Sequence, residues 1–208
     1  MKTLKSFIAY AHILAVLSFP AAAQDVSRGP YVSGGVGAFF LSDSLLPVAP
    51  GESWNIAYGT GHVVSGALGY RFANGFRVEG EVGYRHNKID EMRATSGRVL
   101  GVSGTDMTSL SLMANFYRDF QMGLGFTPYL GAGLGVSHIK LAAHQIRFYT
   151  DHDNMLAYAF MAGMDFPVTE SISLDIEYKY FGAQDPNLDT VNIQYDGHTV
   201  GAKLSYSF

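Results

Sequence analysis

The stretch SISLDIEYKYF, residues 171–181, alternates between apolar and polar side chains at almost every step. One row is apolar and consists of Ile172, Leu174, Ile176, Tyr178 and Tyr180. The other row is polar and consists of Ser173, Asp175, Glu177 and Lys179. Successive side chains of a β-strand point to opposite faces, so this period of two predicts a strand with one oily face and one polar face.

The same alternation recurs along most of the chain. Eight strands are expected, at residues 30–41, 62–72, 76–86, 108–117, 127–139, 154–166, 171–181 and 198–208. Long connections lie near residues 42–60, 87–106, 140–153 and 183–196, and short turns lie at 73–75 and 167–170. Short turns such as Asn74-Gly75 suit tight hairpins. The sequence therefore predicts an all-β fold, an eight-stranded antiparallel up-and-down β-barrel with its long loops at one end.

The first 23 residues have the pattern of a cleaved signal peptide. Lys2 and Lys5 precede an apolar stretch from residue 7 to residue 19, and small residues lead up to Gln24. We expect residues 1–23 to be a signal peptide, the mature chain to start near Gln24, and residues 24–208 to form the barrel. A short N-terminal anchor is the alternative, but the stretch is short for a membrane span.

Charge and cysteine content narrow the function classes. The chain has 14 Lys and Arg and 18 Asp and Glu. Removing Lys2 and Lys5 with the signal peptide leaves 12 basic and 18 acidic residues, a net charge of −6. Such a chain lacks the basic face that a nucleic-acid partner requires. It has no Cys, so neither disulfides nor thiolate metal sites hold the fold.

Alternation alone does not decide which row faces outward. A soluble barrel of lipocalin type would place the apolar row inside. Aromatic residues instead close the apolar rows near the strand ends, and the chain ends on one of them, Phe208. The polar rows are rich in Gly, Ser and Ala, as a narrow lumen filled with side chains requires. These features predict a transmembrane barrel with aromatic girdles at the two interfaces of a Gram-negative outer membrane.

If the apolar row meets lipid, the charged row points into the lumen. Ten residues are then expected to form a lumen ion-pair network, five cationic and five anionic. They are Arg71, Arg77, Arg85, Lys179 and Lys203, with Glu79, Glu81, Asp165, Asp175 and Glu177. An unpaired buried charge costs several kcal/mol, so equal numbers of each sign favour an ion-paired, largely closed lumen.

No catalytic, cofactor-binding or metal-binding residues are predicted. His86 lies near Lys88 and Asp90, and His152 lies between two aspartates, but no nucleophile–base spacing stands out. Ordinary polar loops account for these groups. We therefore expect a protein that is not an enzyme and has no cofactor.

Several stretches resemble the OmpA-like outer-membrane β-barrel proteins, particularly the short, barrel-only forms of α-proteobacteria. They are YVSGGVGAFFLSDS, VSGALGYRFANGFRVEGEVGYR, LSLMANFYRDF, FTPYLGAGLGV, SLDIEYKYFG and VGAKLSYSF, which together span most of residues 31–208. The chain departs from full-length OmpA in having no peptidoglycan-binding domain after the barrel, so anchoring to the cell wall through such a domain is not implied.

The resemblance implies a structural, antigenic or adhesin role for a surface protein. It also implies that Leu204, Tyr206 and Phe208 form a C-terminal signal for the barrel-assembly machinery. Outer-membrane lipid and lipopolysaccharide are expected partners, as is a host or surface ligand at the long loops. Two alternatives stay open: a narrow porin-like diffusion channel and a lipid-modifying outer-membrane enzyme.

Overall fold

The computed structural model describes residues 28–49, 52–94, 96–97, 99–100, 105–143, 153–184 and 195–208. The expected signal peptide, residues 1–23, and the mature start near Gln24 lie outside these residues. Within the described part of the chain, no helix is long and apolar enough to cross a membrane.

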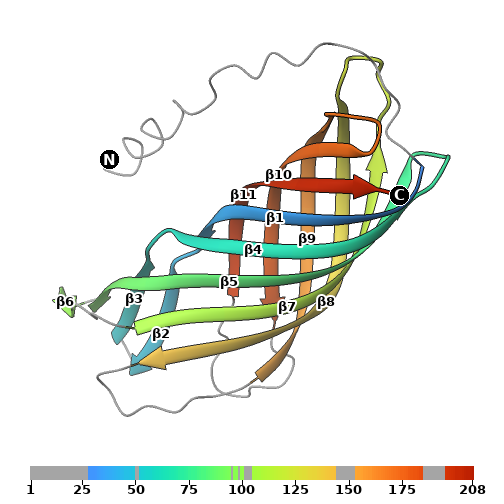
Figure 1. Cartoon of the computed structure of the whole chain (residues 1–208). Helices are drawn as coiled ribbons and strands as arrows, with labels where there is room; N and C mark the ends of the chain where they lie inside the picture. Colours follow the sequence, from blue (N-terminus) through green and yellow to red (C-terminus); the bar gives the residue numbers. More distant parts are fainter. Residues whose placement is uncertain are drawn as a thin grey trace.

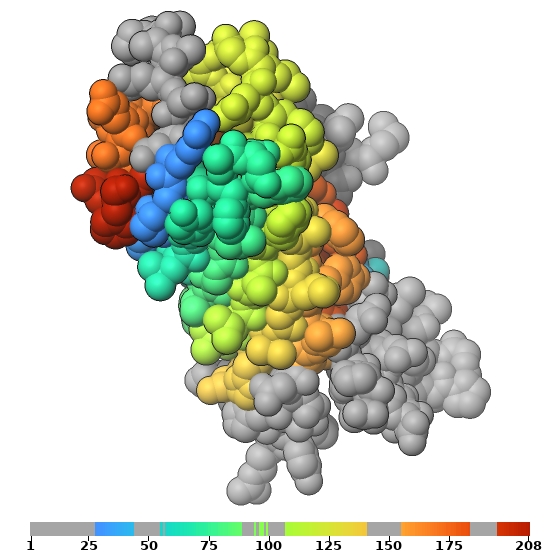
Figure 2. Space-filling model, turned by 90° about the vertical axis from the view of Figure 1, so that its right-hand side faces the viewer, coloured from blue at the N-terminus to red at the C-terminus, as the bar shows by residue number. Residues whose placement is uncertain are grey.

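Eight strands form a closed antiparallel barrel, which confirms the predicted fold (Figure 1). They are β1 (Gly29–Leu41), β4 (Gly61–Arg71), β5 (Phe76–Ala94), β7 (Thr105–Asp119), β8 (Thr127–Ala143), β9 (Asp153–Pro167), β10 (Ile172–Gln184) and β11 (Tyr195–Ser207). Each strand pairs with the next, and β11 pairs with β1 to close the ring, from Tyr31 opposite Ser207 to Leu41 opposite Gly197. Figure 2 shows the first strand, in blue, beside the last, in red.

The two ends of the barrel differ. We call the end that carries the turns at 72–76 and 167–172 and the C-terminus the short-turn end, and the opposite end the long-loop end. At the short-turn end, the amide of Phe72 donates to the carbonyl of Phe76, and Gly75 takes a positive φ of 78°. Glycine enters this region without a steric penalty, which suits the tight hairpin.

Part of the expected loops is in fact β-structure. Residues 42–60 contain the hairpin of β2 (Ser44–Ala49) and β3 (Glu52–Tyr58), and β3 pairs with the far part of β5, from Trp54 opposite Ala94 to Tyr58 opposite Ile89. The short strand β6 (Val99–Leu100) also pairs with β5. These strands lie at the end opposite the C-terminus (Figure 1). Because β5 extends beyond the barrel wall, its backbone needs partners there, and the hairpin supplies them.

The apolar row faces outward, as predicted. Along β10, Asp175 is fully buried while its neighbour Ile176 is 37% exposed, and Leu204 on β11 is 56% exposed. The soluble-barrel alternative is therefore wrong, because its apolar side chains would fill the centre. Lipid offers no hydrogen bonds to the backbone, and a closed barrel satisfies every strand from within.

Glycines on the inner wall make room for large lumen side chains. Gly69, Gly131 and Gly163 each lie directly opposite a tyrosine on the neighbouring strand, namely Tyr31, Tyr117 and Tyr129. A Cβ on any of these glycines would overlap the facing ring. These three glycines therefore leave space for bulky neighbours in the narrow lumen.

Candidate functional site

The lumen gathers every charged residue that the sequence assigned to it. All ten are buried, none being more than 6% exposed. They project from β4, β5, β9, β10 and β11 and meet across the barrel axis. They fall into successive groups from the short-turn end toward the long-loop end.

The first group holds two arginines and three aspartates at the short-turn end. Arg71 Nη2 lies 2.8 Å from Asp165 Oδ2. Arg77 Nε lies 2.9 Å from Asp119 Oδ1, and its Nη1 lies 3.7 Å from Asp175 Oδ1. Each arginine thus joins strands that lie far apart in the sequence.

Glu79 occupies the centre of the second group. The hydroxyls of Tyr31 and Tyr117 donate to its two oxygens at 2.6 and 3.0 Å, and Lys203 Nζ lies 3.7 Å away. Lys203 also contacts Glu177 Oε2 at 3.0 Å. Two of the three tyrosines that the inner glycines accommodate are therefore the hydrogen-bond donors of this carboxylate.

The third group is centred on Lys179. Its ammonium donates to both oxygens of Glu81, at 2.8 and 2.7 Å, and lies 3.5 Å from Glu177 Oε1. Asn115 Nδ2 donates to Glu81 at 3.4 Å, and the Tyr129 hydroxyl donates to Glu177 at 3.1 Å. The two contacts between Lys179 and Glu81 have the length of charge-assisted hydrogen bonds, which are the strong class in proteins.

Arg85 differs from the other four cations. Among the ion pairs of the described residues, none includes it. Its Nη1 donates to Ser111 Oγ at 2.8 Å, and its guanidinium lies 3.8 Å from the ring centroid of Phe181. An aromatic face thus stands where the other cations have a carboxylate. The sequence placed Arg85 in the lumen but gave no sign of this difference.

An apolar layer fills the lumen on the long-loop side of Arg85. It contains Phe39, Met107, Met155, Phe181 and Tyr195, all buried. The ring of Phe181 meets that of Tyr195 edge to face at 6.2 Å. Buried aromatic and methionine side chains packed against one another leave little space for water.

Two small cavities accompany the charged groups. One, of about 30 Å³, is lined in part by Glu81, Arg85 and Lys179, and a second of about the same volume lies at the short-turn end beside Arg71 and Asp119. A cavity of this size holds one or two water molecules. Neither has the dimensions of a solute pathway.

Sequence reasoning missed several members of the lumen. Asp119 brings the count to five cations and six carboxylates, and it continues the inward row of β7 that includes Asn115 and Tyr117. Extending that row by one step would have found it. The tyrosine donors to Glu79 and Glu177 were also missed, although Tyr117 and Tyr129 occupy inward positions by parity.

The three residues of the expected C-terminal signal lie on the outward row at the short-turn end. Leu204 and Tyr206 are exposed, and Phe208 is 73% exposed. The rings of Tyr206 and Phe208 meet edge to face at 5.4 Å. All three would contact the membrane beside the closing seam between β11 and β1.

The described residues contain no group of three His, Cys, Asp or Glu side chains that would hold a metal ion. His62 and His86 stack on the outer wall at 5.1 Å, and His198 Nδ1 lies 2.7 Å from the Tyr178 hydroxyl. His144 and His152 lie outside the described residues.

Comparison with known proteins agrees with this geometry. The family model of the outer membrane protein beta-barrel domain matches residues 10–208. The outer membrane protein PagN of Salmonella typhimurium is 25% identical over an alignment of 224 positions, which covers 94% of this chain and 91% of PagN.

Two solved structures share the fold. Neisserial surface protein A (NspA) has a TM-score of 0.61 at 20% identity, with 86% of this chain and 97% of that chain covered. OprG of Pseudomonas aeruginosa has a TM-score of 0.57 at 14% identity, with 90% and 100% covered. With an outward apolar row, a charged lumen and a family match over nearly its whole length, the chain belongs to the outer membrane protein beta-barrel domain family and is a protein of the Gram-negative outer membrane.

Proposed function

We propose that this chain is a non-enzymatic surface protein whose lumen is closed and whose function lies on its extracellular side. The observation that carries the proposal is the filled lumen. Ten predicted charges and Asp119 occupy it, all but Arg85 in ion-paired groups, and an apolar layer lies on their long-loop side. A barrel of eight strands has room inside only for side chains.

Opening a path for ions would require these pairs to separate. Removing one partner of a buried pair costs about 3–5 kcal/mol, because the other charge stays buried and unpaired. A continuous path would break contacts in all three groups at once. This argues against the alternative of a narrow diffusion channel.

Conductance in a planar lipid bilayer tests the closed lumen. The folded protein, extracted from membranes, is added to the bilayer beside a porin that serves as the insertion control. We expect no steady open level from this protein, although its insertion is verified by heat-modifiable gel mobility of the recovered sample. A large, stable open level would favour the channel instead.

The extracellular role is supported by the β-structure at the long-loop end. The β2–β3 hairpin extends the sheet past the barrel wall along β5. A sheet that continues outside the membrane gives a firmer surface than a flexible loop for an antibody or a host ligand. We therefore place the adhesin or antigenic role on this extension.

Removing the hairpin tests that role. A chain in which residues 44–58 are replaced by a short Gly-Ser linker should keep the barrel, because the eight wall strands remain. Cells that display the full protein are expected to adhere to a host-cell layer more than cells that display the shortened one. Equal adherence would remove the extension from the proposal. A change in lipid A mass on expression would favour the lipid-modifying enzyme.

We also propose that Leu204, Tyr206 and Phe208 are the segment by which the barrel-assembly machinery takes up the chain. Their support is their position at the end of the last strand and directly after it, facing outward and beside the seam that closes the ring. Lipopolysaccharide is the lipid partner that the outer leaflet would supply at the other end of the barrel.

A further inference from the structure

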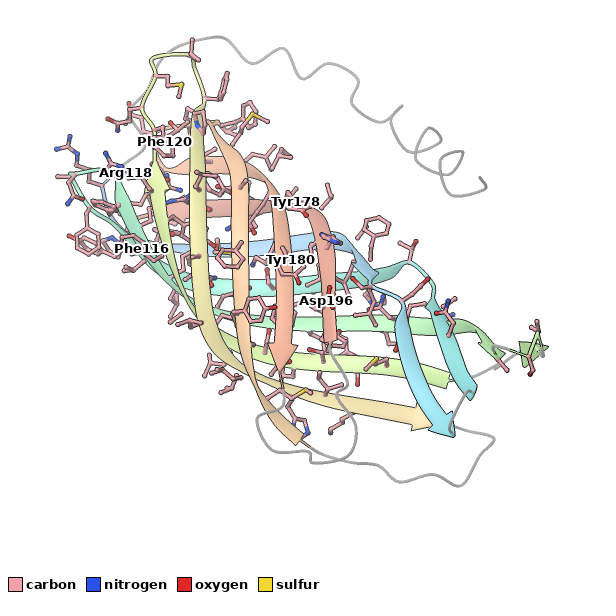
Figure 3. The ribbon with its side chains drawn as sticks, turned by 180° about the vertical axis from the view of Figure 1, so that it is seen from behind. Phe116, Arg118, Phe120, Tyr178, Tyr180 and Asp196 are labelled. Carbon is pink, nitrogen blue, oxygen red and sulfur yellow. The ribbon has the colours of Figure 1, made fainter. Side chains whose placement is uncertain are left out.

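The outer wall carries a continuous group of rings toward the long-loop end of β9, β10 and β11. We call Tyr158, Phe160, Tyr178, Tyr180 and His198 the aromatic platform. Ring centroids lie 6.1 Å apart for Tyr158–Phe160 and for Tyr158–Tyr180, and 5.4 Å apart for Tyr180–His198. Figure 3 shows Tyr178, Tyr180 and Asp196 following one another away from Phe116, Arg118 and Phe120 at the short-turn end.

A hydrogen-bonding edge runs along this platform. The Tyr178 hydroxyl and His198 Nδ1 are 2.7 Å apart. The Tyr180 hydroxyl lies near the Asp196 carboxylate and the Tyr158 side chain, whose ring is 6.1 Å from that of Tyr180. Ser42 Oγ donates to Asp196 Oδ2 at 2.8 Å, which holds the carboxylate in place.

A glycine builds the platform. Gly182 lies directly opposite Tyr158 on one side and Asp196 on the other. A Cβ at this position would meet the Tyr158 ring at 2.5 Å. The absence of a side chain therefore lets the Tyr158 ring lie across β10 toward the carboxylate.

This chemistry fits a saccharide. The C–H faces of a sugar ring pack on aromatic rings, and its hydroxyls need both donors and acceptors along one edge. Ordinary interfacial aromatic belts need only an amphipathic ring at headgroup depth. Here a carboxylate lies among the rings, which favours sugar hydroxyls and disfavours a phosphate at the same point by like-charge repulsion.

The outer wall on the short-turn side of the platform is apolar, which indicates that the sugar is carried by a lipid. Ile176, Val200 and Leu204 continue the same wall toward the short-turn end, and all three are exposed apolar side chains. Acyl chains would lie along them while the headgroup reaches the platform. We propose that the aromatic platform binds the sugar headgroup of a glycolipid of the outer leaflet. This site is on the outer wall and does not depend on whether the lumen is closed.

Native mass spectrometry of the detergent-extracted, folded protein tests the proposal. The protein is titrated with a lipopolysaccharide of short glycan chain and, separately, with phosphatidylglycerol, which has acyl chains and an anionic headgroup but no sugar. We expect retention of the glycolipid, and a dissociation constant about tenfold higher in Tyr180→Phe and in Asp196→Ala, since each loses about one hydrogen bond of roughly 1.4 kcal/mol.

Tyr84→Phe is the matched control. Tyr84 is 44% exposed on β5, as Tyr178 is on β10, and lies on a different part of the outer wall. Its substitution should leave glycolipid retention unchanged. Heat-modifiable mobility verifies that each variant is folded, and the conservative Tyr180→Phe keeps the test decisive if Asp196→Ala misfolds.

Three results would overturn the proposal. Equal retention of phosphatidylglycerol would mean that no sugar is recognised. Unchanged retention in the folded Tyr180→Phe variant would remove the hydroxyl edge from the site. If the saccharide freed of its acyl chains competes as well as the intact glycolipid, the platform serves a soluble glycan and not a lipid.

Discussion

Replacing Lys179 by methionine is the sharpest test of how the charged lumen stabilises this barrel. The ammonium contacts both oxygens of Glu81, at 2.7 and 2.8 Å, and lies 3.5 Å from Glu177. All three side chains are nearly fully buried. Without the lysine, Glu81 keeps the amide of Asn115 at 3.4 Å and a longer-range attraction to Arg85, with which it forms no ion pair within 4 Å. A buried charge left in this state costs about 3–5 kcal/mol of unfolding free energy.

The double variant distinguishes pairing from simple loss of packing. Replacing both Lys179 and Glu81 by methionine removes the unpaired charge and keeps similar volume in the lumen. Such replacements are often neutral or stabilising. We therefore expect the double variant to be within about 2 kcal/mol of the wild type, which makes it more stable than Lys179→Met by at least about 1 kcal/mol and makes the two substitutions non-additive.

The measurement is urea unfolding of the protein reconstituted in phospholipid vesicles, followed by the gel mobility of unboiled samples. Folded and unfolded barrels migrate differently, so the band ratio gives the equilibrium at each urea concentration. Two additive single substitutions, or a Lys179→Met variant within about 1 kcal/mol of the wild type, would refute the view that this pair stabilises the closed lumen.

Three other predictions use the same unfolding assay or a cellular one. Gly163→Ala should destabilise the barrel by about 1–3 kcal/mol because the new Cβ overlaps a lumen tyrosine ring, whereas Gly80→Ala, which meets nothing within 4 Å on the outer wall, should change stability by less than about 0.5 kcal/mol. Arg77→Met should cost about 3–5 kcal/mol because it leaves two aspartates without their ion-pair partner. Arg85→Met breaks no ion pair of the described residues and loses a serine hydrogen bond, two aromatic contacts and a longer-range attraction to Glu81, so it should cost less; equal losses would contradict the difference drawn between these arginines. Deleting Phe208 should lower the amount of protein in the outer membrane of cells while refolding from urea into detergent stays unchanged, and a loss in both would assign this residue to stability instead of assembly.

The sequence predicted the barrel well because parity is a local property. Asp175 is inward and Ile176 outward for the same reason that any two neighbours of a strand face opposite ways, so a single decision about the apolar row oriented all eight strands. The pattern did not predict Asp119 as a lumen residue because it is the last residue of β7. A pattern of period two gives the least information at the ends of a strand.

The sequence could not predict which lumen charges form ion pairs with one another, for a different reason. Lys179 lies on β10 and Glu81 on β5, and these strands are not neighbours in the barrel. Which of them meet across the axis depends on the stagger of the whole ring, a property of closure and not of either segment. The sequence does not predict the β2–β3 hairpin because its residues show no clear alternation, and its pairing to β5 depends on how far that strand extends.

The seam between β1 and β11 has a consequence for the order of events during biogenesis. Tyr31 pairs with Ser207 across this seam, and these two residues are separated by almost the entire exported chain. The first strand therefore reaches the periplasm with an edge whose backbone hydrogen bonds are made only when the last strand arrives. A partly exported chain cannot form a closed barrel. Such an open edge invites pairing with any other unfinished strand nearby. Escort by a periplasmic chaperone until the final residues are released would be needed to keep nascent chains apart.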